Sequence, residues 1–115
     1  MADSALSIID IKQITGQIKI ATNIPLTHLN DHVVRVSVMT EPYFWHYHPN
    51  SDEIFMVLEG SVFIDFEDKT IELFPNQLFT IPKNVKHRTR PNGSRSVNLT
   101  FESADLVTTK TDAPT

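Results

Sequence analysis

The sequence predicts an all-β protein, an antiparallel sandwich or barrel preceded by one short N-terminal helix. Apolar and polar residues alternate over 34–38, 62–66 and 97–101, which is the period-two pattern of strands with two different faces. Turn-forming Pro, Asn, Asp and Gly residues separate these runs. Strand-sized segments recur about every eight to twelve residues, a spacing typical of sandwiches and barrels.

The N-terminal segment shows the only helical pattern. Its isoleucines are irregularly spaced and fit either a short strand with one helical turn or a longer helix. We expect one short helix from Asp10 to Thr15, ending at Gly16, because glycine commonly follows a helix end. A chain of 115 residues fits one domain, 1–115. We divide it into an N-terminal segment 1–28, a barrel of about 29–102 and a flexible polar tail 103–115.

The predicted strand 53–59 is apolar on both faces. Glu53, Phe55 and Val57 share one face, and the opposite face carries Ile54, Met56 and Leu58. A strand of this kind is expected to be covered on both sides. One face fills the interior, and the other packs against either the N-terminal segment or a second subunit. We predict a homodimer that covers this outward face.

Composition and charge limit the classes of function. No cysteine is present, which excludes disulfides, thiolate metal ligands and cysteine nucleophiles. The net charge is −4, which argues against a nucleic-acid partner. No basic residue precedes an apolar run at the N-terminus, and the longest clear apolar run, 54–58, is far too short for a bilayer. We therefore expect a cytoplasmic protein that binds no membrane.

Three histidines and one glutamate form the candidate metal site. If 44–48 is extended, His46 and His48 point to the same side, about 6.6 Å apart along the strand. A turn at 49–52 brings Glu53 back beside them on the neighbouring strand. His87 opens another strand-like segment. His28 and His32 flank a predicted turn and are expected at the surface.

Imidazoles and one carboxylate suit a single divalent transition metal ion. A His-x-His pair is also common on an ordinary polar strand face, but Glu53 and His87 make that interpretation less favourable. Without sulfur ligands, Fe, Mn, Ni, Co and Zn all remain possible, because ligand type alone does not select among them.

The spacing of these residues resembles the cupin superfamily. His46-x-His48, Glu53 and Gly60 match the ligands and closing glycine of its first motif, and Pro82 and His87 match the second. Asn76 and Asn84 stand where the family usually has glycine. Thr40 stands at the position of the first motif's opening glycine, and Pro91 at that of the second motif's closing asparagine. These departures affect turns rather than ligands. Residues 29–34 and 44–46 resemble small mannose-6-phosphate isomerase-like cupins. The resemblance implies a double-stranded β-helix, a jelly-roll-like barrel with an internal metal, and subunits that often form dimers.

Residues of the same parity as the ligands are expected to line the pocket. By this rule Phe44, Phe55 and Thr89 lie beside the metal, with the two phenylalanines as apolar walls. Arg35 and Asn98 are expected at the surface, with an inward orientation that binds an anionic group of a ligand as the alternative. A basic cluster over 83–95 is expected to protect an edge strand, with steering of an anionic ligand as the alternative.

Two classes of function fit this site. The first is a metal-dependent enzyme, of dioxygenase or isomerase type, that acts on a small polar molecule. The second is a non-catalytic module that binds or senses a small ligand through the same metal. The catalytic residues and the substrate are not predictable from the sequence.

Overall fold

The computed structural model describes residues 6–115 and contains one helix, α1 (Ile11–Gly16), within that range. The Asp10 side chain accepts a hydrogen bond of 3.0 Å from the backbone N–H of Gln13, and so caps the first turn. The predicted short helix is confirmed. The first five residues of the predicted N-terminal segment lie outside the described range. Within residues 6–115, no helix combines the length and apolar character needed to cross a membrane.

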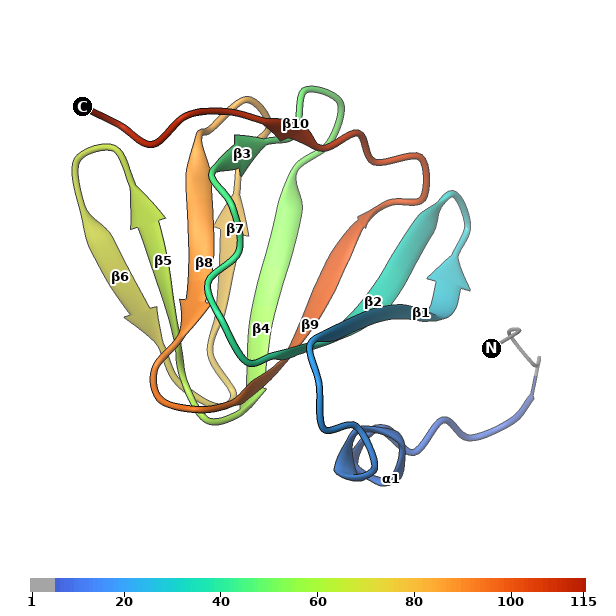
Figure 1. The fold of residues 1–115 in the computed structure, drawn as a ribbon. Coiled ribbons are helices and arrows are strands. Elements are labelled where there is room, and N and C mark those ends of the chain that lie inside the picture. Colours follow the sequence, from blue (N-terminus) through green and yellow to red (C-terminus); the bar gives the residue numbers. More distant parts are fainter. Residues whose placement is uncertain (1–5) are drawn as a thin grey trace.

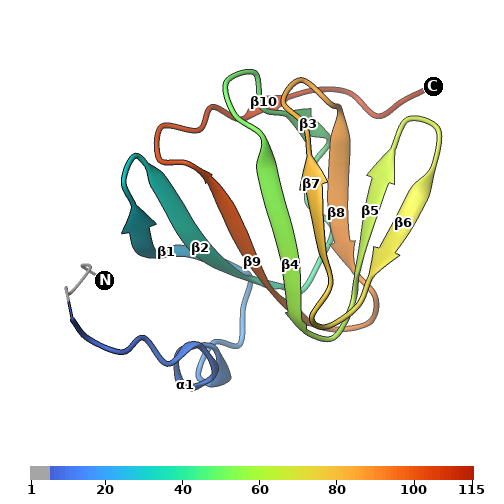
Figure 2. The same cartoon turned by 180° about the vertical axis from the view of Figure 1, so that it is seen from behind.

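The strands form two five-stranded sheets, each with only antiparallel pairs (Figures 1 and 2). The first sheet has the order β1-β2-β9-β4-β7, with the strands β1 (Thr22–Leu29), β2 (His32–Met39), β9 (Ser96–Ser103), β4 (Glu53–Glu59) and β7 (Leu78–Ile81). The second has the order β10-β3-β8-β5-β6, with the strands β10 (Thr109–Lys110), β3 (His46–Tyr47), β8 (His87–Pro91), β5 (Val62–Phe66) and β6 (Thr70–Leu73).

This architecture confirms the predicted all-β fold, a double-stranded β-helix of two antiparallel sheets, and the barrel that these sheets form is not closed. Within residues 6–115, no ladder of hydrogen bonds joins the two sheets into a cylinder. Each sheet keeps two edge strands, because the chain passes from sheet to sheet through turns. Gly60, in the turn between β4 and β5, has φ +73°, and a Cβ there would lie 2.6 Å from the Arg95 carbonyl oxygen. A side chain would therefore clash with the backbone that approaches this turn.

Two apolar clusters form the core. The cluster between the sheets contains Phe55, Val57, Val62, Ile64, Leu73 and Ile81. The cluster on the other face of the first sheet contains Leu26, Val36, Val38, Val97 and Leu99. Ile9, Ile11, Ile14 and Ile18, in and around α1, pack against this second cluster together with Met56 and Leu58. The N-terminal segment of the same chain thus covers part of the outward face of β4.

Both ends of the barrel segment differ from the expected boundaries. The sheet begins at Thr22 rather than near residue 29, because β1 forms a hairpin with β2. The tail was expected to be flexible, yet it forms β10, which pairs with β3. Asn50 fixes the approach to β10, since its amide donates to the Asp105 carbonyl at 3.0 Å and accepts from the Val107 N–H at 2.9 Å.

Candidate metal centre

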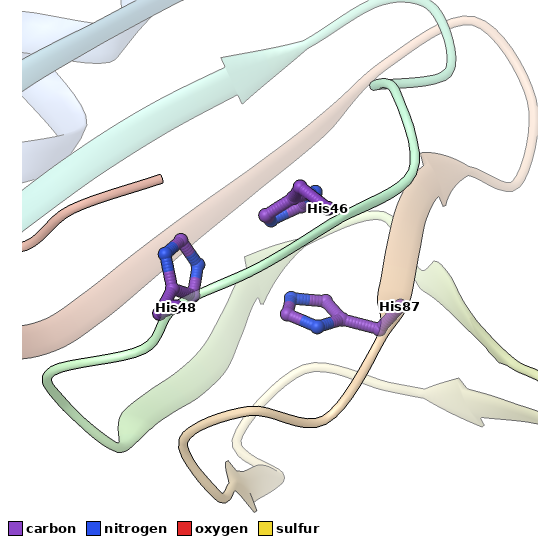
Figure 3. Close-up of side chains that lie close together, drawn as sticks. All are labelled: His46, His48 and His87. Atoms are coloured by element: carbon purple, nitrogen blue, oxygen red, sulfur yellow. The ribbon is translucent and has the colours of Figure 1, made fainter. Parts of the chain in front are cut away.

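Strands β3 and β8 bring three imidazoles together (Figure 3). His46 and His87 lie directly opposite each other in the ladder, with ring centroids 4.3 Å apart. His48 follows the end of β3, and its ring centroid lies 4.9 Å from that of His46. One ring nitrogen from each histidine lies within 4.8 Å of the other two, and all three residues are buried. The three histidines predicted as ligands therefore form one cluster.

The first residue of β4 supplies a carboxylate from the opposite sheet. Oε1 of Glu53 lies 3.6 Å from Nε2 of His48 and 3.7 Å from Nε2 of His87. These distances are too long for good hydrogen bonds. Glu53 is 8% exposed, so its carboxylate faces the imidazoles rather than solvent. The fourth predicted ligand thus lies beside the three histidines.

Each histidine is oriented by a backbone carbonyl that accepts from its Nδ1–H. The acceptors are Phe44 O for His46 at 2.8 Å, Val85 O for His87 at 2.8 Å and Val107 O for His48 at 3.1 Å. Because a carbonyl only accepts, these bonds place the proton on Nδ1 and leave Nε2 as the free lone pair. Metal-bound histidines in proteins are commonly oriented in this way.

Two of the Nε2 atoms are buried without a partner. In the part of the chain that the structure describes, neither His48 Nε2 nor His87 Nε2 has a hydrogen-bond partner. Leaving a buried polar atom unsatisfied costs about 1–3 kcal/mol. A divalent ion bound to His46, His48, His87 and Glu53 would satisfy both nitrogens, and three nitrogens with one oxygen are a donor set for transition metals. The residues present therefore fit the metal that the sequence predicted.

Burial and neighbouring charges keep His46 and Glu53 in the forms that bind a metal, whereas the pKa of His48 is raised. Burial and the nearby His87 lower the pKa of His46 to about 4, so its imidazole is neutral at physiological pH. Burial alone would raise the pKa of Glu53, but the neighbouring His48 and His87 lower it to about 2. Burial opposes protonation of His48, yet the Glu53 carboxylate raises its pKa.

A cavity of about 370 Å³ opens beside the four residues. Two of the three predicted lining residues, Phe55 and Thr89, lie in its wall. Phe44 does not: it is 37% exposed, and Tyr43 lines the cavity instead. The parity argument fails here because 42–45 is not a regular strand, so side chains need not alternate between faces.

Several wall residues were missed by the sequence analysis. Leu106 and Thr108 come from the tail, and Thr22 and Asn23 come from the segment expected to precede the barrel. Their position depends on pairing between distant parts of the chain, and no local pattern marks it. Ser37 and Thr100 also line the cavity. They belong to period-two strands whose polar positions face inward, a signal that was available in the sequence.

Two polar residues of β9, Asn98 and Glu102, are buried rather than exposed at the surface. Asn98 was expected at the surface but is fully buried, and its amide donates to Ser96 Oγ at 3.1 Å. Glu102 is 3% exposed. Burial and the charge of Glu53 raise the pKa of Glu102 to about 7. The Glu102 carboxyl group can therefore hold or release a proton near neutral pH.

The remaining predicted surface residues lie away from the cluster. His28 and His32 are exposed, as expected, and Arg35 is half-buried. Within the basic cluster, Arg88 and Arg90 both bind the Asp65 carboxylate, at 2.9 and 2.8 Å. Their guanidinium groups also lie over the rings of Trp45 and Phe63. These two cations serve the second sheet rather than the cavity.

Comparisons with known proteins agree with this fold. A family model for cupin domains matches residues 33–101. The uncharacterized protein YdbB of Bacillus subtilis is 51% identical over 87 residues, which are 75% of this chain and 76% of that protein. The chain belongs to the cupin family. The family model describes cupin domains in general rather than the mannose-6-phosphate isomerase-like subgroup.

Two further proteins show similarity of different kinds. The polyketide synthase CurC of Streptomyces cyaneus is 34% identical over 62 residues, which cover 54% of this chain but only 40% of that protein. A cupin-2 domain protein from Shewanella frigidimarina superposes with a TM-score of 0.79 at 24% identity, over 84% of this chain and 94% of that one. The similarity to the Shewanella protein supports the fold alone.

Proposed function

We propose that this protein is a metal-dependent enzyme that acts on a small polar molecule. The observation that carries the proposal is the pair of unsatisfied Nε2 atoms on His48 and His87, which lie beside an ionised carboxylate at the wall of a cavity. When bound, a divalent ion would supply Lewis-acid chemistry toward a carbonyl, enol or carboxylate oxygen. Dioxygenation and isomerisation are the two reaction types that we propose to test.

The chain's own residues have separate roles in this proposal. His46, His48, His87 and Glu53 hold the metal, and the carbonyls of Phe44, Val85 and Val107 orient the rings. Phe55 excludes water from one side of the cavity. Glu102 is buried and lines a separate hollow rather than this cavity, so we give it no role in the chemistry at the metal.

The second candidate is a non-catalytic module that binds or senses a small ligand through the same metal. The cavity and ligand set serve binding equally well. The match to CurC covers a part of both chains, and it makes oxygen-rich polyketides one substrate class to include in a screen.

Metal content tests the site first. We expect protein purified without added metal, then loaded and desalted, to retain about one divalent ion per chain by elemental analysis. His48→Ala and His87→Ala should lose it, because each removes a ligand. His32→Ala, which changes an exposed histidine outside the cluster, is the matched control. Equal metal content in the wild type and His48→Ala would place any metal elsewhere.

Turnover then separates the enzyme from the binding module. Oxygen uptake by the Fe(II) form reports dioxygenation, and NMR of the substrate reports isomerisation. Ligand binding without turnover in the Fe, Mn, Co, Ni and Zn forms would favour the binding module.

A further inference from the structure

We infer that Asn50 and Asp52 are positioning residues for the metal centre. Both are exposed and lie in the linker 49–52, which joins two of the four ligands. Asn50 holds the chain segment whose carbonyl orients His48, and Asp52 holds the turn whose carbonyl orients His87. The inference rests on the proposed function, because the two imidazoles are taken to bind the ion. It adds residues that act on the ligands without touching the metal.

The linker 49–52 carries the chain from the second sheet to the first. It begins after His48, which follows β3, and ends at Glu53, the first residue of β4. Figures 1 and 2 show this loop beside the C-terminal segment that leads into β10. Because the linker is only four residues long, the contacts that fix it also fix the spacing of the two ligands that it joins.

Asn50 acts on His48 through the C-terminal segment. Its Nδ2 donates to the Asp105 carbonyl at 3.0 Å, and its Oδ1 accepts from the Val107 N–H at 2.9 Å. One planar amide thus pairs with two backbone groups of the same segment. The Val107 carbonyl accepts from the Nδ1–H of His48 at 3.1 Å, and Oγ1 of Thr108 lies 3.3 Å from the same nitrogen. Without the Asn50 amide, both groups would be free to move away from the ring.

Asp52 acts on His87 through the turn that precedes β8. Oδ1 of Asp52 accepts from the Lys83 N–H at 2.9 Å. The next N–H of the turn, that of Asn84, donates at 2.8 Å to the carbonyl just before the linker. Two successive N–H groups therefore hold the turn against the linker. The Val85 carbonyl follows in the same turn and accepts from the Nδ1–H of His87 at 2.8 Å.

The exposure of Asn50 and Asp52 separates their effect on the site from an effect on folding. Neither residue belongs to the two apolar clusters. Hydrogen bonds at exposed positions add little net stability, because water replaces the lost partner. Metal affinity responds more strongly, since loss of a group that orients a metal-bound histidine typically costs about 10–100-fold. We therefore expect substitutions here to weaken metal binding while the fold stays intact.

Exchange of the ring protons assigns each residue to its histidine. NMR of isotope-labelled full-length protein, metal-free and loaded with Zn(II), follows solvent exchange of the Nδ1–H groups of His48 and His87. Asn50→Ala should speed exchange at His48 and leave His87 unchanged, whereas Asp52→Ala should do the reverse. A purely structural role would not separate the two rings, because general loosening of the fold would speed exchange at both.

Zinc affinity, measured by competition with a chelator, should fall about tenfold in Asn50→Ala and in Asp52→Ala. Asp52→Asn should keep the wild-type affinity, because its amide oxygen still accepts from the Lys83 N–H and only the charge is lost. Asp10→Ala is the matched control, since Asp10 is an exposed residue that accepts a backbone N–H at 3.0 Å at the start of α1. It should lower stability and leave zinc affinity intact.

The possible failures are distinguishable. Loss of Zn(II) from the wild type on desalting overturns the proposed function and this inference together. Retained Zn(II) with unchanged affinity in Asn50→Ala and Asp52→Ala, or with equal acceleration of exchange at both rings, overturns only the inference. Affinity as low in Asp52→Asn as in Asp52→Ala would assign the effect to charge and overturn the positioning role of Asp52.

Discussion

His46, His48 and His87 each use one ring nitrogen for the backbone and leave the other for the cavity. The carbonyl acceptors lie at 2.8–3.1 Å, so each ring is oriented before any ligand arrives. The low pKa of His46, about 4, keeps its ring neutral, and the low pKa of Glu53, about 2, keeps that carboxylate ionised. His46 and Glu53 are thus prepared in the protonation states that metal binding requires.

Phe55 links the cavity wall to the core, which leads to a prediction. It is 4% exposed and belongs to the cluster between the sheets. Phe55→Ala should destabilise the protein by about 3 kcal/mol through lost packing. Because Phe55 is not a ligand, the metal should stay while ligand affinity or turnover falls. Denaturation curves, metal content and titration with a bound ligand check the three effects. A folded, metal-loaded variant with unchanged affinity and kinetics would remove Phe55 from the proposed pocket wall.

Asp65 gives a prediction that depends on pH. Its pKa is well below the usual range, chiefly because Arg90 hydrogen-bonds to the carboxylate, with Nε at 2.8 Å and the terminal nitrogen at 3.1 Å. Arg88 and Arg90 are 34% and 33% exposed, so we expect Asp65→Asn to cost only about 1–2 kcal/mol at neutral pH.

The sign of the Asp65 effect follows from the depressed pKa. The stabilisation is present above the pKa of the unfolded chain, about 3.9, and is lost as pH falls below it toward the folded value. Urea denaturation of wild type and Asp65→Asn should therefore show a difference that narrows as the pH drops below about 4. Glu67→Gln serves as the exposed control. A difference that widens on acidification would contradict the assigned ion pair.

At the scale of elements, the segment after β9 completes the site. It forms β10 beside β3, supplies the carbonyl of Val107 to His48, and places Leu106 and Thr108 in the cavity wall. Deleting residues 104–115 should keep the sheets folded, since β10 is a two-residue edge strand. Metal affinity should fall about 10–100-fold, because His48 loses the acceptor that orients it. Competition with a chelator measures this change.

A shorter deletion provides the control for the tail. Removing only 112–115 leaves β10 and the Val107 carbonyl in place, and should retain the metal affinity of the full chain. Equal affinity in both deletions and the full chain would show that the tail does not position His48.

At the scale of the whole molecule, the outward face of the first sheet remains the proposed dimer surface. α1 and its flanks cover part of it, but Ile54, Val34 and Phe101 are half-buried and line a separate hollow of about 620 Å³. We propose that a second copy of the chain packs here. Light scattering at micromolar concentration should give the mass of a dimer.

A charge placed on this face should separate the dimer. Ile54→Lys is expected to give a monomer, whereas Phe74→Lys, which changes an exposed residue after β6, should not. A monomeric wild type would overturn the proposed assembly and leave the N-terminal segment as the only cover that we have identified.

The sequence by itself determined the elements and the residues able to bind a metal. Alternation predicts strands because the two faces of a strand meet different surroundings, and Asp10 marks the start of the helix because its side-chain cap acts within a few residues. The spacing of His46, His48 and Glu53 predicts proximity because one turn joins their two strands. These signals are local and can be read along the chain.

Only the tertiary structure decided how distant segments complete the site and where the sheets end. Residues 21–23, Leu106 and Thr108 reach the cavity through pairings that no short pattern specifies. Tyr43 replaces Phe44 in the wall because the chain before β3 is not a regular strand. The sheets stay open because turns, rather than continuous ladders, join them. These outcomes depend on long-range packing and on hydrogen bonds between segments far apart in the sequence, which the alternation of neighbouring residues does not encode.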